Sequence, residues 1–144
     1  MGNFARLVRD TLSAAAPAAV LSGLPSTAYA LARGEDPLEA SLAAGTLLTP
    51  RETRKIPLLV SGATAHVAVS LGWAFVLAAT LPKRHTVLAG AAAGLAIAAL
   101  DLGVAGARFP RIRALRPGPQ AADHVAFGAI AGAVLAHRRR HDTA

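Results

Sequence analysis

The chain of 144 residues contains no cysteine, so a disulfide framework and a thiolate metal site are both excluded. It also lacks the short motifs of common enzyme classes: no G-x-S-x-G, P-loop, dinucleotide-binding fingerprint or H-E-x-x-H is present. No internal repeat is found. The sequence therefore favours a protein that is not an enzyme, with no catalytic residues and no bound cofactor, and a membrane enzyme built on its intramembrane His and Asp residues stays open as the alternative.

The apolar residues lack the amphipathic stripe of a soluble helical bundle. They are mainly Ala, Leu, Gly and Val, collected in long runs with the charges confined between them, which is typical of a membrane protein. The net charge of +7 would suggest nucleic acid in a soluble protein. Because these charges flank apolar runs, they favour the bilayer and its anionic headgroups as partners, with no nucleic acid.

Four apolar runs predict four membrane-spanning helices. A helix needs about 20 apolar residues to cross a bilayer, and the predicted spans cover residues 11–32, 56–81, 86–107 and 121–136. The fourth is short but can extend into the neighbouring loop. We predict a single all-α domain over residues 1–144, an integral membrane four-helix bundle with both termini on one side.

The first run has two interpretations. Pro17 and Pro25 interrupt it, and Ala28-Tyr29-Ala30 after a basic start resembles a secretory signal with its cleavage site. Because the run is long for the apolar part of a signal peptide, we favour a retained span.

The connection between the first two runs predicts a short interfacial helix. Asp36 can cap a helix, Pro37 fits its first position and Glu39 can reach back to the cap. A helix over residues 37–48 is about 18 Å long, too short to span. Residues 49–52 repeat the start pattern, which predicts that the next helix begins there and continues into the second span.

Basic residues leave the orientation nearly undecided, because both sides of the predicted bundle carry similar numbers. The signal-like N-terminus favours both termini inside a bacterial inner (plasma) membrane. A loop before the fourth span is rich in arginine, at Arg108, Arg111, Arg113 and Arg116. We interpret it as a solvated topogenic loop, with headgroups or an acidic partner as the alternative ligand.

Small residues predict how the last two spans pack. Gly90 and Gly94 in the third span and Gly128 and Gly132 in the fourth each form G-x-x-x-G, which lets membrane helices approach closely. In an antiparallel pair, Gly90 falls level with Gly132 and Gly94 with Gly128.

Ionisable residues within the predicted spans form a layer in one half of the bilayer. Asp101 is costly inside an apolar helix, roughly 2.5–3.5 kcal/mol on insertion scales, and His66 and His124 fall at similar depth with Asp123 nearby. Trp73, deep in the second span, is predicted to be a packing residue.

Three interpretations of the layer follow. A structural latch, in which Asp101 accepts hydrogen bonds that fix helix register, is favoured. The second is a proton or cation pathway. Burial raises the pKa of a carboxyl group and lowers that of an imidazole, so the two groups can exchange a proton near neutral pH. The third is a metal site, but its ligands come from three helices without local ligand spacing, so we predict none.

The segments D-P-L-E-A (36–40), A-G-T-L-L (44–48) and Q-A-A-D-H-V-A-F-G (120–128) are similar to small uncharacterised bacterial membrane proteins with about four spans. The resemblance implies no activity, and motifs of small multidrug exporters and fluoride channels are absent. We predict a non-enzymatic accessory or structural subunit of a membrane assembly or homo-oligomer. The alternative is a small proton- or cation-linked transporter or channel that uses His66, Asp101 and His124.

Overall fold

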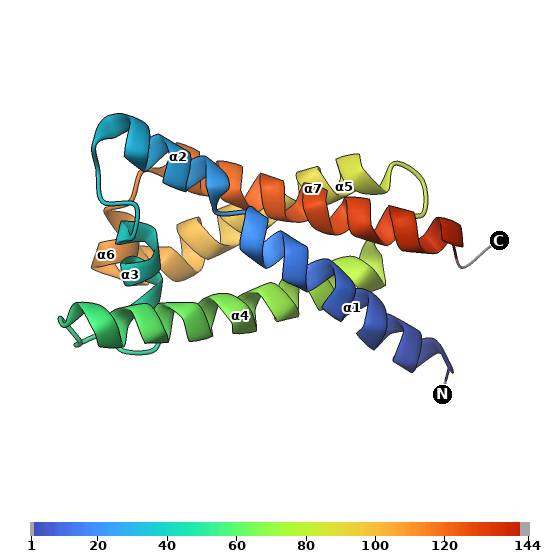
Figure 1. Cartoon of the computed structure of the whole chain (residues 1–144), viewed down its shortest axis with the longest axis horizontal. Coiled ribbons are helices and arrows are strands. Elements are labelled where there is room, and N and C mark those ends of the chain that lie inside the picture. Colours follow the sequence, from blue (N-terminus) through green and yellow to red (C-terminus); the bar gives the residue numbers. More distant parts are fainter. Residues whose placement is uncertain (1, 142–144) are drawn as a thin grey trace.

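A computed structural model describes residues 2–141, which are all-helical and contain no strand. The long helices lie side by side, and both ends of the chain lie at one end of the bundle (Figure 1). We call this end A, and the opposite end, which holds the short helices, end B. The elements are α1 Gly2–Leu21, α2 Leu24–Arg33, α3 Glu39–Gly45, α4 Lys55–Thr80, α5 Thr86–Leu100, the π-helix η1 Asp101–Ala105, the 3-10 helix η2 Gly106–Arg108, α6 Pro110–Arg113 and α7 Pro117–His141.

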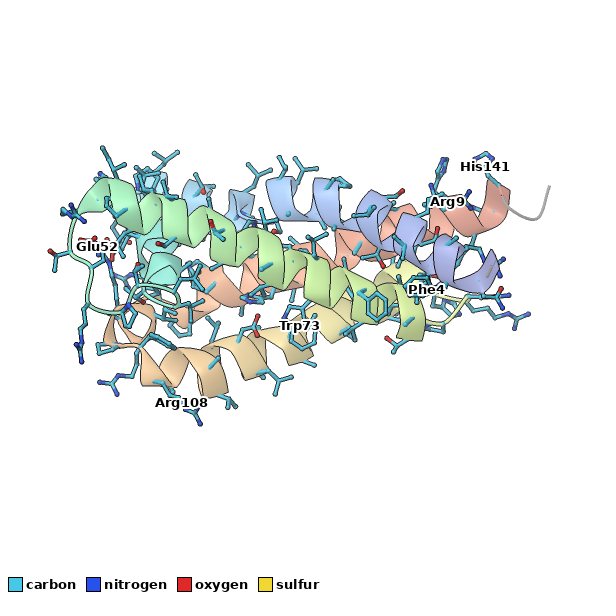
Figure 2. The ribbon with its side chains drawn as sticks, turned by 90° about the horizontal axis from the view of Figure 1, so that it is seen from below. Phe4, Arg9, Glu52, Trp73, Arg108 and His141 are labelled. Carbon is cyan, nitrogen blue, oxygen red and sulfur yellow. The ribbon has the colours of Figure 1, made fainter. Side chains whose placement is uncertain are left out.

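Helix α7 is the centre of the packing. It lies along α5 and also contacts α1 and α2, while α4 packs against α1 and α3. The core between them is made of small and branched side chains from α1, α4, α5 and α7, including Ala14, Ala74, Leu77 and Leu135. Although a short turn joins α4 to α5, the two helices scarcely touch and diverge towards end B (Figure 2).

The predicted first span, residues 11–32, is divided into α1 and α2. The chain breaks at Ser22 and Gly23, because Pro25 lacks the N–H that would continue the α1 hydrogen-bond ladder. Pro25 instead lies in the first turn of α2, where no such bond is needed. Gly34 ends α2 in the left-handed conformation, with φ of 67°.

The prediction that a helix begins at residues 49–52 is wrong, since α4 begins at Lys55. The Glu52 carboxylate instead accepts hydrogen bonds from the backbone N–H groups of Thr53 and Arg54, both at 2.9 Å. It also pairs with the Arg54 guanidinium at 2.8 Å. These hydrogen bonds, led by that from the Arg54 side chain, lower the pKa of Glu52 to about 2, and the backbone of Arg54 is extended.

Three other predicted boundaries change. The short helix predicted at residues 37–48 is α3, which packs against α4 with Leu42 and Ala43 buried. The third span is an α-helix only to Leu100, after which the backbone widens into η1 at Asp101. The fourth span, predicted at 121–136, is part of the longer α7, and the preceding loop contains α6.

Within residues 2–141, two helical segments are long and apolar enough to cross a membrane: Lys55–Thr80, and Thr86–Arg108, which joins α5, η1 and η2. Most of their surface faces outward, and apolar side chains such as Ile56 and Leu88 are 75% and 71% exposed. Charged groups gather at the two ends, with Arg9 and His141 at end A and Glu52 and Arg108 at end B (Figure 2).

Candidate functional site

A cavity of about 680 Å³ lies in the end-B half of the bundle. Its walls come from the α1–α2 break, α3, α4, η1 and α7, so it lies where α4 and α5 have diverged. The volume is within the range of small-molecule binding sites, about 300–1,000 Å³. All four residues of the predicted polar layer line it: His66, Asp101, Asp123 and His124.

Asp101 lies at the first position of η1 and joins three helices. Its Oδ2 accepts a hydrogen bond from the indole N–H of Trp73 on α4, at 3.2 Å, and lies 3.3 Å from Nε2 of His124 on α7. Both interactions use the same carboxylate oxygen. Oδ1 accepts no hydrogen bond from any residue in the range 2–141, so half of the carboxylate keeps its capacity to bind another group.

The contacts of the two ring nitrogens of His124 indicate which of them carries a hydrogen. Nδ1 is 2.8 Å from the carbonyl oxygen of Gln120, and because a carbonyl only accepts, Nδ1 carries a hydrogen. Nε2 faces Asp101. A proton added to this pair, on Nε2 or on the carboxylate, would lie between the two side chains, so the geometry suits a shared exchangeable proton.

His66 and Asp123 line the same cavity but do not contact Asp101. Nε2 of His66 donates to the carbonyl oxygen of Ala19 at 2.9 Å, across from α4 to α1. Asp123 accepts a hydrogen bond from the backbone N–H of Ser26 at 2.8 Å. That N–H is in the first turn of α2, where helical N–H groups lack internal partners, so Asp123 caps α2 from another helix.

The predicted layer is thus one contacting pair with two neighbours. In the described part of the chain, no three His, Asp or Glu side chains are close enough together to hold a metal ion. Trp73 belongs to the site, although it was predicted only to pack. His66, Ser70 and Trp73 recur at intervals of four and three, which places all three on one face of α4, and this spacing could have revealed it.

The four glycines lie at the contact between α5 and α7. A Cβ atom on Gly90 would overlap the carbonyl oxygen of Gly128, and one on Gly128 would overlap that of Gly90. A Cβ on Gly132 would meet Thr86. The faces are those predicted, but the levels differ, because Gly128 lies between Gly90 and Gly94 and not opposite Gly94 alone.

This contact brings Asp101 and His124 together. A Cβ atom on Gly94 would overlap the carbonyl oxygen of His124, so the absence of a side chain at Gly94 lets α7 approach α5 closely. The imidazole then reaches the carboxylate about two turns further along the α5–η1 segment.

Two of the four loop arginines form ion pairs at end B. Arg111 binds Glu39 through two parallel hydrogen bonds of 2.7 and 2.9 Å, which ties α6 to α3. Arg116 lies 3.3 Å from Glu35 and over the ring of Tyr29. Arg108 and Arg113 are exposed.

No family model matches the chain, and neither a curated protein nor a solved structure matches it. The candidate site rests on its own geometry.

Proposed function

We propose that this chain is a four-span, multi-pass membrane protein that acts as a small proton- or cation-linked carrier through the Asp101–His124 pair. One observation supports it above the others. Across residues 11–32, 56–81, 86–107 and 117–136, the only Asp, Glu, His, Lys or Arg residues are His66, Asp101, Asp123 and His124. All four line the same cavity.

The chemistry of the pair suits proton linkage. A proton shared between a carboxylate and an imidazole is released when a cation takes the place of the positive charge, and it returns when the cation leaves. A purely structural latch would need no cavity beside it, whereas here a cavity of about 680 Å³ lies beside the pair. Ionisable groups inside a membrane commonly mark relays and substrate pathways, which supports the carrier over the latch.

The four-span arrangement is supported by the position of the cavity. Its walls include the α1–α2 break and α7 in addition to the two apolar segments around α4 and α5. If α1, α2 and α7 cross with them, Asp101, Asp123 and His124 are partly covered by protein, which lowers the cost of polar groups inside a bilayer. The accessory-subunit role stays a prediction, since the glycine faces that could have received a partner are filled by the α5–α7 contact.

Cysteine labelling tests the topology, because the native chain has no cysteine. With four spans and both termini inside, Asn3→Cys and Lys83→Cys remain unlabelled by an impermeant maleimide in intact cells, and Thr53→Cys is labelled. Permeabilised cells, in which all three react, are the control. If only α4 and α5 cross, Asn3→Cys instead reacts like Thr53→Cys, and the four-span proposal is wrong.

Asp101→Asn tests the carrier. In proteoliposomes with an imposed pH gradient and a cation supplied on the alkaline side, we expect the wild type to dissipate the gradient faster than empty vesicles. Asp101→Asn is expected to fall to the empty-vesicle rate, because the amide cannot exchange a proton for the cation. Asp36→Asn makes the same chemical change at an exposed position outside the cavity and is expected to behave as wild type. Equal rates for Asp101→Asn and wild type would contradict the proposal.

A further inference from the structure

The charge of the cavity is opposite to that of the chain. The whole sequence has 15 Lys and Arg against 8 Asp and Glu, yet no Lys or Arg in the described residues lines the cavity, whereas Asp101 and Asp123 both do. The remaining ionisable lining groups are the imidazoles of His66 and His124. When the proton of the Asp101–His124 pair has left, the lining has carboxylates and no fixed cation, and such a region of low dielectric selects a positively charged ligand.

The size of the cavity and the arrangement of its His, Asp and Glu side chains favour an organic molecule over a bare metal ion as the natural occupant. Metal ions need several ligand atoms at about 2–2.6 Å, and within residues 2–141 no three candidate side chains converge in this way. The volume of about 680 Å³ is that of a site for an organic molecule.

The remaining lining is apolar and aromatic. Leu59, Val69 and Ile97 supply aliphatic surface, and Trp73 and Phe127 supply aromatic rings. Aromatic rings attract cations through their π faces, and indole is the strongest of them. The ligand that matches this lining has one positive charge on a largely apolar body.

We propose that the cavity binds a lipophilic organic cation, with its charge held beside Asp101. The Trp73 indole and the His124 imidazole both use Oδ2 of this carboxylate, so Oδ1 is available for the charged group of the ligand. Asp123 adds a second negative charge to the lining. The organic cation is the substrate class of the proposed carrier, and its assignment therefore rests on the same site.

Equilibrium dialysis with radiolabelled tetraphenylphosphonium tests this ligand class directly on the full chain in detergent. Tetraphenylborate is the matched probe, because it has nearly the same shape and the opposite charge. We expect saturable binding of the phosphonium above the level of empty micelles and no saturable binding of the borate. Trp73 is the only tryptophan, so its fluorescence is expected to report the same titration.

Two isosteric variants locate the charge. Asp101→Asn is expected to weaken phosphonium binding by about tenfold or more, because attraction between close charges is several times stronger in a cavity than in water. Asp123→Asn is expected to weaken it less, because the charged group of the ligand is placed beside Asp101. Asp36→Asn, outside the cavity, is expected to bind as wild type, and circular dichroism checks that each variant remains folded.

Equal binding of phosphonium and borate would overturn the organic-cation site without any variant, and so would an unchanged affinity in a folded Asp101→Asn protein. The proposed carrier fails in a different way. Phosphonium binding without proton flux leaves the cation site standing and removes the transport activity. Proton flux without phosphonium binding keeps the carrier and removes the organic cation.

Discussion

Gly128→Val is expected to separate α5 from α7 and to cause a large loss of bundle stability. A side chain at Gly128 overlaps the backbone carbonyl of Gly90 and approaches the backbone N of Gly94. Overpacking typically costs about 1–3 kcal/mol when neighbouring side chains can yield. At Gly128 the obstacle is backbone on both sides of the contact, so we expect a loss at or above the top of that range.

Gly90→Val is expected to behave in the same way, because the overlap between Gly90 and Gly128 is reciprocal. Gly72→Val is the matched control, since Gly72 also lies within a helix, α4, and a Cβ atom there meets nothing within 4 Å. The measurement is denaturant unfolding in detergent followed by circular dichroism. Curves for Gly128→Val and Gly72→Val that coincide would show that the close approach of α5 and α7 contributes nothing to stability.

The effect on the site follows from the same contact. Gly94 lets α7 approach at His124, and at that separation Nε2 of His124 lies 3.3 Å from Oδ2 of Asp101. If α5 and α7 move apart, the pair can no longer share a proton. We therefore expect folded variants at Gly94 to lose proton flux together with packing.

Residue spacing within single helices predicted the glycine faces and the depth of the ionisable residues. The intervals of four between Gly90 and Gly94 and between Gly128 and Gly132 identify the faces that meet. Counting along α5 and α7 also placed Asp101 and His124 at similar depth. Because these quantities depend mainly on the rise of a helix, the chain order alone was sufficient.

Features that depend on contacts between distant segments were not predictable in the same way. The wide turn at Asp101 and the hydrogen bond from Trp73 require α4 and η1 to be placed first. The cavity has the same origin, since it depends on how far α4 and α5 diverge. The start of α4 was missed for a local reason, because the carboxylate of Glu52 satisfies the N–H groups that an earlier helix would have used.

The contact between α3 and α4 is a second place where backbone meets backbone, and no G-x-x-x-G marks it in the sequence. A Cβ atom on Gly62 would overlap the carbonyl oxygen of Ser41, and one on Gly45 would overlap that of Leu58. Ala40, Ser41 and Ala44 of α3 line the cavity, so this contact holds one wall of the candidate site in position.

Gly62→Val is expected to release α3 while leaving the long helices packed. Helix α3 has only seven residues and is too short to be stable alone. The Arg111–Glu39 pair is partly exposed, with side chains 33% and 42% accessible, and such pairs contribute at most about 1 kcal/mol. That is too little to hold α3 against an overlap worth about 1–3 kcal/mol, whereas α4 keeps its contacts with α1 through Ala74 and Leu77.

An Ala43→Cys reporter makes this release measurable, because Ala43 is fully buried in α3 and the chain has no other thiol. We expect maleimide to label this thiol about tenfold to hundredfold faster when Gly62→Val is also present, and at the original rate with Gly72→Val. An unchanged labelling rate would mean that contacts other than the one at Gly62 hold α3 in place. Faster labelling accompanied by weaker phosphonium binding would show that the cation binds best when α3 is packed against α4.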